Sequence, residues 1–146
     1  MKSLRVYSVA GYGIMVLALI LLIFVRGLFS SLVVVIAVQI LAAMLMVWAR
    51  VTFGSRSFHF AADATKGGLV TTGPYKYIRH PIYAAVLLFT VAGVLGNFSW
   101  LNAGLFVLLC FGVGIRIFCE ERLVQIEYPE YTEYAGRTKR IIPLVF

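Results

Sequence analysis

The residues from 82 to 118 read "IYAAVLLFTVAGVLGNFSWLNAGLFVLLCFGVGIRIF", in which two apolar runs are separated only by "GNFS" at 96–99. A helix needs about 20 mostly apolar residues to cross a bilayer, and the run at 100–118 approaches that length. The run at 82–95 is shorter. Because so short a connection joins spatial neighbours, we expect two antiparallel helices packed side by side.

Two further apolar runs precede this hairpin, at 6–25 and 32–49, and the chain as a whole is 62% hydrophobic. Soluble domains are roughly 45–50% apolar. The sequence therefore predicts an all-α integral membrane protein with about four transmembrane helices, the third being the shortest. We expect the first run to be a span and not a signal peptide, because it exceeds the usual signal core of about 7–15 residues.

Within a single domain, residues 1–146, we predict four parts. These are two N-terminal spans (1–50), a cytoplasmic loop (51–81), the helical hairpin (82–118) and an interfacial tail (119–146). The loop and an interfacial helix in the tail are expected to form a pocket at the membrane surface, because the apolar side of the tail suits a helix that lies on the membrane.

The charge of the chain is strongly basic, with 13 lysines and arginines against 6 acidic residues. In a soluble protein this balance would suggest nucleic acid as a partner. With four spans, however, all basic residues except Arg26 fall on one side of the membrane or at its edge. The positive-inside rule makes that side cytoplasmic, so we expect membrane lipids as partners and no nucleic acid.

Polar groups are scarce inside the predicted spans, Gln39 being the main exception in the first three. A transporter normally has ionisable or strongly polar groups near the bilayer midplane, so this class is disfavoured. Cys110, Cys119, His59 and His80 show no zinc-binding spacing, and we predict no metal site. All six acidic residues lie in the loop or the tail, which places any chemistry at the cytoplasmic interface.

The stretch "GPYKYIRHPIY" at 73–83 leads into the third span. Pro81 suits the first turn of a helix, which places His80 at or near the N-cap. The tyrosines and basic residues of this stretch could form an interfacial belt that anchors a helix end. A belt requires no histidine, however, and the N–H groups of a helix start can bind a carboxylate or another anion.

A second polar cluster, "RIFCEERL", covers residues 116–123. Arg116 and Glu120 are four residues apart, so their side chains meet on one helical face. The pair is either an ordinary ion pair where the helix leaves the membrane or part of a site. Because the hairpin brings both of its outer ends to one membrane face, we expect this cluster beside residues 73–83, in a half-open pocket reachable from water and lipid.

Taken in order, "LVTTGPYKYIRHPIY", "RIFCEERL" and "PEYTEYAGRTKRIIP" resemble the isoprenylcysteine carboxyl methyltransferase family of integral-membrane methyltransferases, which is related to the phospholipid N-methyltransferases. The resemblance implies that S-adenosylmethionine binds in a pocket made by the loop, the third helix start and the tail. The residues that it implies for the cofactor are Leu69, Val70, Tyr75, His80, Pro81, Tyr83 and one of the paired glutamates, taken as Glu121. Arg116 and Glu120 would face the methyl acceptor as catalytic residues.

The function expected on this basis is methyl transfer from S-adenosylmethionine to a lipophilic or membrane-borne acceptor. Arg116 favours a carboxylate, such as that of a prenylcysteine. A phospholipid amine or a thiol stays open as the acceptor, and an amine would need a base. An alternative of another class is a non-catalytic membrane scaffold whose basic and aromatic rim binds anionic lipid, and affinity for the cofactor separates the two.

Overall fold

The fold is a bundle of antiparallel helices. The computed structural model describes residues 2–54 and 68–142. Its elements are α1 (Lys2–Phe24), α2 (Val33–Phe53), the 3-10 turn η2 (Gly73–Lys76), α3 (Pro81–Gly96), α4 (Trp100–Glu127) and α5 (Tyr131–Arg137). Extended pairing among the described residues is limited to one isolated parallel bridge, between Ile78 and Lys139. The all-α prediction is confirmed.

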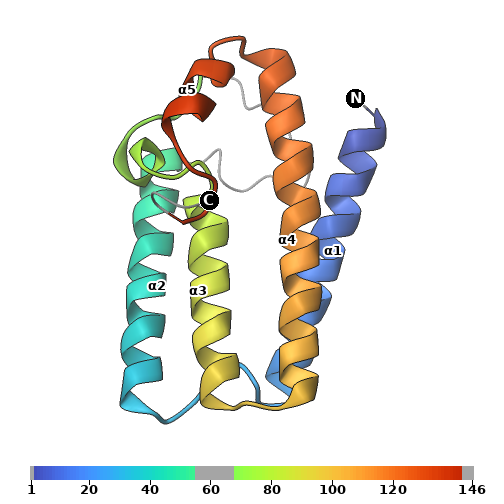
Figure 1. Ribbon diagram of the computed structural model, residues 1–146, viewed down its shortest axis with the longest axis vertical. Helices are drawn as coiled ribbons and strands as arrows, with labels where there is room; N and C mark the ends of the chain where they lie inside the picture. The colour runs from blue at the N-terminus through green and yellow to red at the C-terminus, as the bar shows by residue number, and fades with distance from the viewer. Residues whose placement is uncertain (1, 55–67, 143–146) are drawn as a thin grey trace.

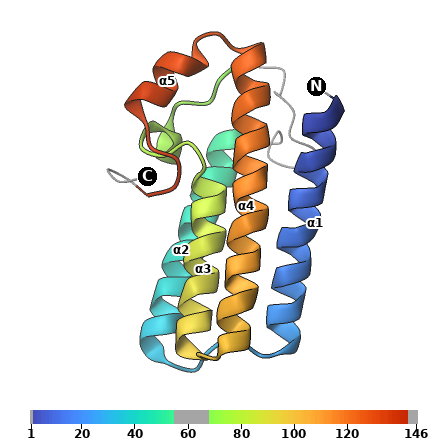
Figure 2. The same cartoon turned by 45° about the vertical axis from the view of Figure 1, so that its right-hand side comes forward.

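Each long helix runs antiparallel to the next one along the chain (Figure 1). The helices associate as two pairs, because α1 lies along α4 and α2 lies along α3 (Figures 1 and 2). The start of α1, the turn η2 and the helix α5 lie at the same end of the bundle, which we call the site end. The connections α1–α2 and α3–α4 lie at the opposite end.

Three of these helices, α1, α2 and α4, are long and apolar enough to cross a membrane, and α3 is a shorter apolar helix. Large apolar side chains are exposed along α1, α2 and α4, as expected of surfaces that face lipid. The chain is therefore a membrane protein by length and composition of its helices, and the third apolar helix is the shortest, as predicted.

The fourth helix extends beyond the apolar run that we expected to span the membrane. Helix α4 has 28 residues and continues through position 118, where we expected the span to end and the tail to begin. At 1.5 Å per residue it is about 42 Å long, so its last turns extend beyond the start of α3. Among the described residues after α4, one further helix forms, α5, which folds back over η2 and the start of α3 (Figure 2).

Small residues allow the helices to approach closely. A Cβ atom added to Gly11 of α1 would lie 2.9 Å from the carbonyl oxygen of Gly112 in α4, and one added to Gly112 would lie 2.8 Å from that of Gly11. In α3, a Cβ atom on Gly93 would overlap the carbonyl oxygen of Leu28. Close backbone approach at small residues is typical of membrane helices, where apolar burial drives little association.

Gln39 of α2 is buried and binds both the connection after α1 and helix α3. Its Nε2 donates to the carbonyl oxygen of Leu28 at 2.8 Å and to that of Phe89 at 3.3 Å. An unsatisfied carbonyl in apolar surroundings is costly, so these bonds stabilise the turn after α1 against α3. The polar exception noted in the sequence therefore has a structural role.

Candidate functional site

The entry into α3 is built by a tight turn followed by a proline. Gly73 has a φ of +57°, and an added Cβ would lie 2.6 Å from Oγ1 of Thr52, so both conformation and space favour glycine there. Pro81 occupies the first turn of α3, and His80 is its N-cap residue, as predicted. The His80 side chain makes no capping hydrogen bond, and it lies against α4 instead.

Tyr83 of α3 and two residues of α4 form a closed triangle of hydrogen bonds. Arg116 Nε donates to Tyr83 Oη at 2.9 Å, and Arg116 Nη2 donates to Glu120 Oε1 at 2.8 Å. Tyr83 Oη donates to the same Glu120 Oε1 at 2.5 Å. The predicted contact of Arg116 with Glu120 is confirmed, and so is the adjacency of the third helix start and the fourth helix.

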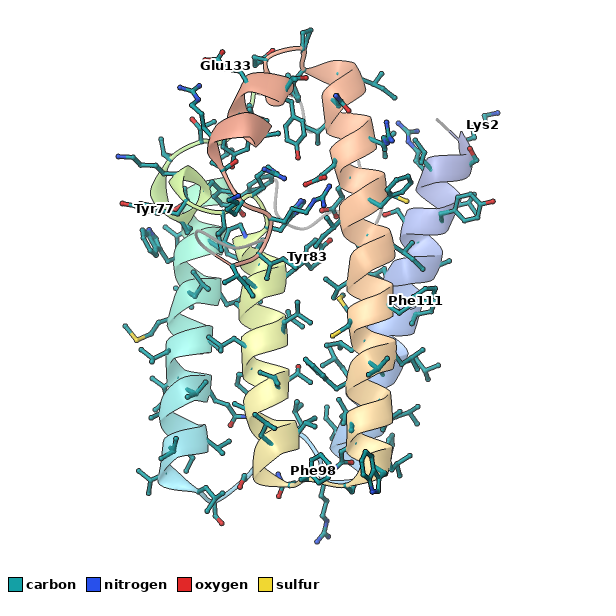
Figure 3. The ribbon with its side chains drawn as sticks, viewed as in Figure 1. Lys2, Tyr77, Tyr83, Phe98, Phe111 and Glu133 are labelled. Atoms are coloured by element: carbon teal, nitrogen blue, oxygen red, sulfur yellow. The ribbon has the colours of Figure 1, made fainter. Side chains whose placement is uncertain are left out.

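The Arg116 side chain is only 6% exposed, compared with 23% for Glu120. Its guanidinium carbon also lies 5.3 Å from the centre of the Tyr12 ring of α1, a cation–π distance. A buried cation is tolerated only when it is paired and hydrogen-bonded, and Arg116 meets both conditions. Figure 3 shows Tyr83 directed into the space between α3 and α4, below α5.

His80 lies between the two glutamates of α4. Its Nε2 is 3.3 Å from Glu121 Oε1, and its Nδ1 is 3.7 Å from Glu120 Oε2. The imidazole is largely buried, with its ring centre 5.8 Å from that of Tyr83. One histidine therefore connects the Arg116 triangle with the neighbouring carboxylate of Glu121.

Glu121 is surrounded by cations. Arg79 Nε donates to its Oε1 at 3.1 Å, and Arg140 binds it through two nitrogens, with Nη2 at 3.0 Å from Oε2. Together with His80, three basic side chains contact this carboxylate. Charge-assisted, forked contacts of this kind are the stronger class of hydrogen bond. The hydrogen bonds with Glu121 also raise the pKa of Arg140.

The tail is attached to the segment before α3 mainly through Arg79. The Nη1 of this arginine donates to the carbonyl oxygens of Ala135 at 2.7 Å and of Thr138 at 2.5 Å. Ala135 lies in the last turn of α5 and Thr138 is its C-cap residue, and helix ends leave such acceptors without an internal partner. Arg79 therefore caps α5 from a distant part of the chain.

Backbone hydrogen bonds continue the same attachment. The N–H of Arg79 donates to the carbonyl oxygen of Lys139 at 2.7 Å, and that of His80 donates to Arg140 at 2.9 Å. The backbone N–H of His80 is therefore used by the tail, so it is not one of the helix-start groups that bind an anion. The remaining role of His80 in the site rests on its imidazole.

Aromatic side chains join the tail to η2 and α2. Tyr134 Oη donates to the carbonyl oxygen of Tyr75 at 2.7 Å, and the Tyr75 ring lies 5.4 Å from that of Phe53. Burial raises the pKa of Tyr134 to about 12, so the phenol keeps the proton that it donates. Tyr131 packs against Tyr134, with ring centres 5.9 Å apart.

Most of the residues named from the sequence come together. The hydrogen-bonded network includes His80, Tyr83, Arg116, Glu120 and Glu121. Pro81 starts the helix that carries two of them, and Tyr75 joins through the tail. Leu69 and Val70 are half-buried in the segment before η2 and take no part in this network.

Two features of the site were not predicted from the sequence. Arg140 was not distinguished from the other basic residues of the tail, because "RTKR" gives no spacing signal. Tyr83 was grouped with the cofactor residues, yet its hydroxyl contacts the pair expected on the acceptor side. This contact depends on which side of α3 packs against α4, and tertiary packing of this kind cannot be read from the sequence.

Residues 31–126 match the model of the isoprenylcysteine carboxyl methyltransferase family. The chain belongs to this family. The match contains the motifs at 73–83 and 116–123 and begins before α2, earlier than the resemblance noted in the sequence. A family of membrane methyltransferases agrees with the apolar helices and with a polar cluster at one end of them.

Two curated relatives match part of the chain. The cobalt-zinc-cadmium resistance protein CzcN of Cupriavidus metallidurans is 35% identical over 82 residues, which are 51% of this chain and 35% of the relative. The nickel-cobalt-cadmium resistance protein NccN of Alcaligenes xylosoxydans xylosoxydans is 34% identical over 76 residues, 51% of this chain and 36% of the relative. The matched part thus spans about a third of each relative. No solved structure matches the chain at a significant level.

The names of both relatives refer to metal resistance, which raises the question of whether the described residues include a metal-binding group. Residues 2–54 and 68–142 contain no group of three or more His, Cys, Asp or Glu that could hold a metal ion. Cys110 and Cys119 are free thiols on α4. His59 lies outside the described residues.

Proposed function

We propose that this protein transfers a methyl group from S-adenosylmethionine to a lipophilic or membrane-borne acceptor. The observation that supports this most directly is the buried Arg116–Tyr83–Glu120 triangle, joined through His80 to Glu121 at the site end of an apolar bundle. Membership of a methyltransferase family supports the reaction class. The position at a helix end suits a polar donor and a lipid-borne acceptor that meet at one interface.

The side chains at the site end have the chemistry that S-adenosylmethionine requires. Carboxylates and aromatic faces attract a cation, and arginine binds a carboxylate. We propose that Tyr75, His80, Pro81 and Glu121 hold the cofactor, with the backbone of Leu69 and Val70. When bound, the cofactor supplies an electrophilic methyl group on a sulfonium.

The work left to the protein in such a transfer is mostly positioning, because orientation alone supplies a large part of the rate. Arg116 is suited to an acceptor carboxylate, which a guanidinium can bind through two hydrogen bonds. We therefore favour a carboxylate acceptor of the prenylcysteine type. Phe111 and Phe118, exposed on α4, belong to the apolar surface that a lipid-borne acceptor would share with the bilayer.

A phospholipid amine or a thiol is the second candidate acceptor. The observation that favours it is His80, whose two ring nitrogens lie 3.3 Å and 3.7 Å from glutamate oxygens. With one ring nitrogen unprotonated, this imidazole could take up the proton that an amine or a thiol loses during methylation, and the two carboxylates would stabilise the resulting imidazolium. A carboxylate acceptor has no proton to lose and therefore needs no base.

Calorimetry with S-adenosylmethionine on the detergent-solubilised protein tests the cofactor. We expect saturable binding, whereas a lipid-binding scaffold has no affinity for this ligand. Incubation with methyl-labelled cofactor and a lipid extract, followed by identification of the labelled species, then decides among carboxylate, amine and thiol. Absence of both binding and transfer contradicts the proposed function.

Replacement of the Arg116–Glu120 pair tests its catalytic role. We expect Arg116→Met, Glu120→Gln and the double variant to lose methyl transfer by on the order of a hundredfold or more, because lost positioning alone can cost that much. Cofactor affinity should change little. If the two residues form only an ion pair, the double variant should retain near-wild-type turnover, because removing both charges together leaves no buried charge unpaired.

A matched control exists in the same chain. Arg137 and Glu133 form another pair four residues apart, at 3.1 Å, but their side chains are 73% and 74% exposed. Glu133→Gln should leave both turnover and cofactor affinity unchanged, because exposed pairs contribute little. A loss of activity in this control would mean that general changes of charge, and not the site, explain the variants.

A further inference from the structure

The hydroxyl of Tyr83 occupies a central place in the Arg116–Glu120 pair. It accepts a hydrogen bond from Arg116 Nε and donates its own proton to Glu120 Oε1. A phenol has a single proton to donate, and here that proton is used within the triangle. The hydroxyl therefore contacts both members of the pair that we place on the acceptor side.

The ring that carries this hydroxyl is held rigidly. Tyr83 is 8% exposed and belongs to the core cluster that also contains Met15, Val113 and Ile117. A tyrosine has two side-chain torsions, and packing on the ring fixes both. Arginine and glutamate are longer and have more rotatable bonds, so they lose more conformational entropy when ordered. A fixed hydroxyl that bonds to both side chains can therefore help to orient them.

The contacts also give the two oxygens of Glu120 different surroundings. Oε1 accepts from both Tyr83 and Arg116, whereas Oε2 lies 3.7 Å from His80 Nδ1. An ion pair on α4 alone has no need of a residue from α3, because the 2.8 Å contact already pairs the charges. The hydrogen bonds of Tyr83, which come from α3, fix the orientation of both side chains. Orientation matters if the pair binds a ligand, but it matters little if the pair only neutralises charge.

We propose that Tyr83 is a positioning residue of the acceptor side, whose hydroxyl sets the orientation of Arg116 and Glu120 toward the methyl acceptor. This inference rests on the proposed function. It differs from the role that the family resemblance implies for this tyrosine, which is contact with the cofactor. The two roles predict different results when the hydroxyl is removed: a positioning residue leaves cofactor affinity unchanged, whereas a cofactor contact weakens it.

Tyr83→Phe is the decisive variant, because it removes one oxygen and keeps the packed ring. We expect kcat/KM for the acceptor, at saturating cofactor, to fall about tenfold or more, since hydrogen bonds to charged groups are among the stronger ones. The Kd of S-adenosylmethionine, measured by calorimetry without acceptor, should stay within about twofold. Tyr77→Phe is the control, because Tyr77 lies in the same motif and is exposed.

A double-mutant cycle tests whether Tyr83 acts through the pair. In a Glu120→Gln background, adding Tyr83→Phe should cause little further loss of kcat/KM, because residues that act as a unit are not additive. Independent, multiplicative losses would overturn the inference. A cofactor Kd raised about tenfold by Tyr83→Phe would also overturn it, in favour of a cofactor contact.

Failure of the proposed function is a separate result. A wild-type protein that neither binds S-adenosylmethionine nor transfers methyl groups overturns that function and the acceptor role of Tyr83 with it. A wild-type protein that does both, combined with a Tyr83→Phe variant of unchanged kcat/KM, overturns only the positioning role. Equal loss of thermal stability, cofactor affinity and turnover in Tyr83→Phe would show a structural role and likewise overturn it.

Discussion

Two ion pairs of this protein have the same spacing and different surroundings. Arg116–Glu120 and Glu133–Arg137 are both four residues apart on a helix, and both form contacts. Spacing predicted the contact in the first pair, because side chains four apart share a helical face. It could not predict the burial of Arg116 or the hydroxyl of Tyr83, since both depend on which face of α3 turns toward α4.

At the same scale, Gly93 sets how closely α3 approaches the connection after α1. We predict that Gly93→Ala destabilises the protein by about 1–3 kcal/mol, because the new Cβ would overlap the carbonyl oxygen of Leu28. Thermal unfolding in detergent measures this change. Gly104→Ala is the matched control, since nothing lies within 4 Å of its added Cβ. That variant should be neutral or more stable, because alanine favours a helix more than glycine does.

Equal effects of the two glycine substitutions would contradict the close packing described for Gly93. In that case, the cost would come from helix propensity or from the detergent, and not from the contact with Leu28.

Among the elements, helix α4 departs most from its expected bounds. The apolar run ends near residue 118, but "CEERLVQIE" at 119–127 contains strong helix formers, and the helix continues to Glu127. It ends shortly before Pro129, whose ring disfavours helix at the preceding residue. Hydropathy thus indicates where the apolar run ends, whereas propensity and proline account for where the helix ends.

The attachment of α5 depends on Arg79, which the sequence placed either in an interfacial belt or in the expected pocket. We predict that Arg79→Lys speeds amide hydrogen exchange in residues 131–140 by about tenfold or more, because lysine cannot reproduce the forked contacts with Glu121 and two tail carbonyls. Exchange in the middle of α1 and α4 should be unchanged. Mass spectrometry of peptides from the detergent-solubilised protein measures both.

Arg137→Lys provides the comparison for this experiment, since Arg137 lies in α5 itself but in an exposed pair. It should leave exchange within about twofold of the wild type. Slow exchange of the tail in Arg79→Lys would show that the backbone bonds of Lys139 and Arg140 hold the tail without the guanidinium.

For the whole molecule, the number, order and antiparallel course of the apolar helices could be predicted from the sequence. Four apolar runs joined by two short connections allow few arrangements, and the start of α1, η2 and α5 then share one end. The pairing of α1 with α4, however, depends on close contacts such as that of Gly11 with Gly112, which no periodicity in the runs indicated.

The distribution of basic residues predicts the orientation of the bundle in the membrane, and we expect the site end to face the cytoplasm. Figure 3 shows Glu133 at the site end and Phe98 at the opposite end. In a chain with Cys110 and Cys119 replaced by alanine, a cysteine in place of Phe98 should react with an impermeant reagent added to intact cells. A cysteine in place of Glu133 should react only after permeabilisation.

The reverse labelling pattern would contradict this topology and would place the site on the outer face of the membrane. Labelling of both positions in intact cells would show a mixed orientation.

The shortness of α3 has a consequence for where the reaction can take place. With 16 residues, this helix is about 24 Å long, less than the roughly 30 Å thickness of a typical hydrocarbon core. Hydrophobic mismatch of this kind is relieved by local thinning of the bilayer or by shifting a helix end below the headgroups, and each ångström costs a fraction of a kcal/mol. His80 and Tyr83 lie at the N-terminal end of α3. For the lipid-borne acceptor that we propose, the depth at which it meets these residues would then depend both on the protein and on acyl-chain length, so the composition of the host membrane would affect its access to the site.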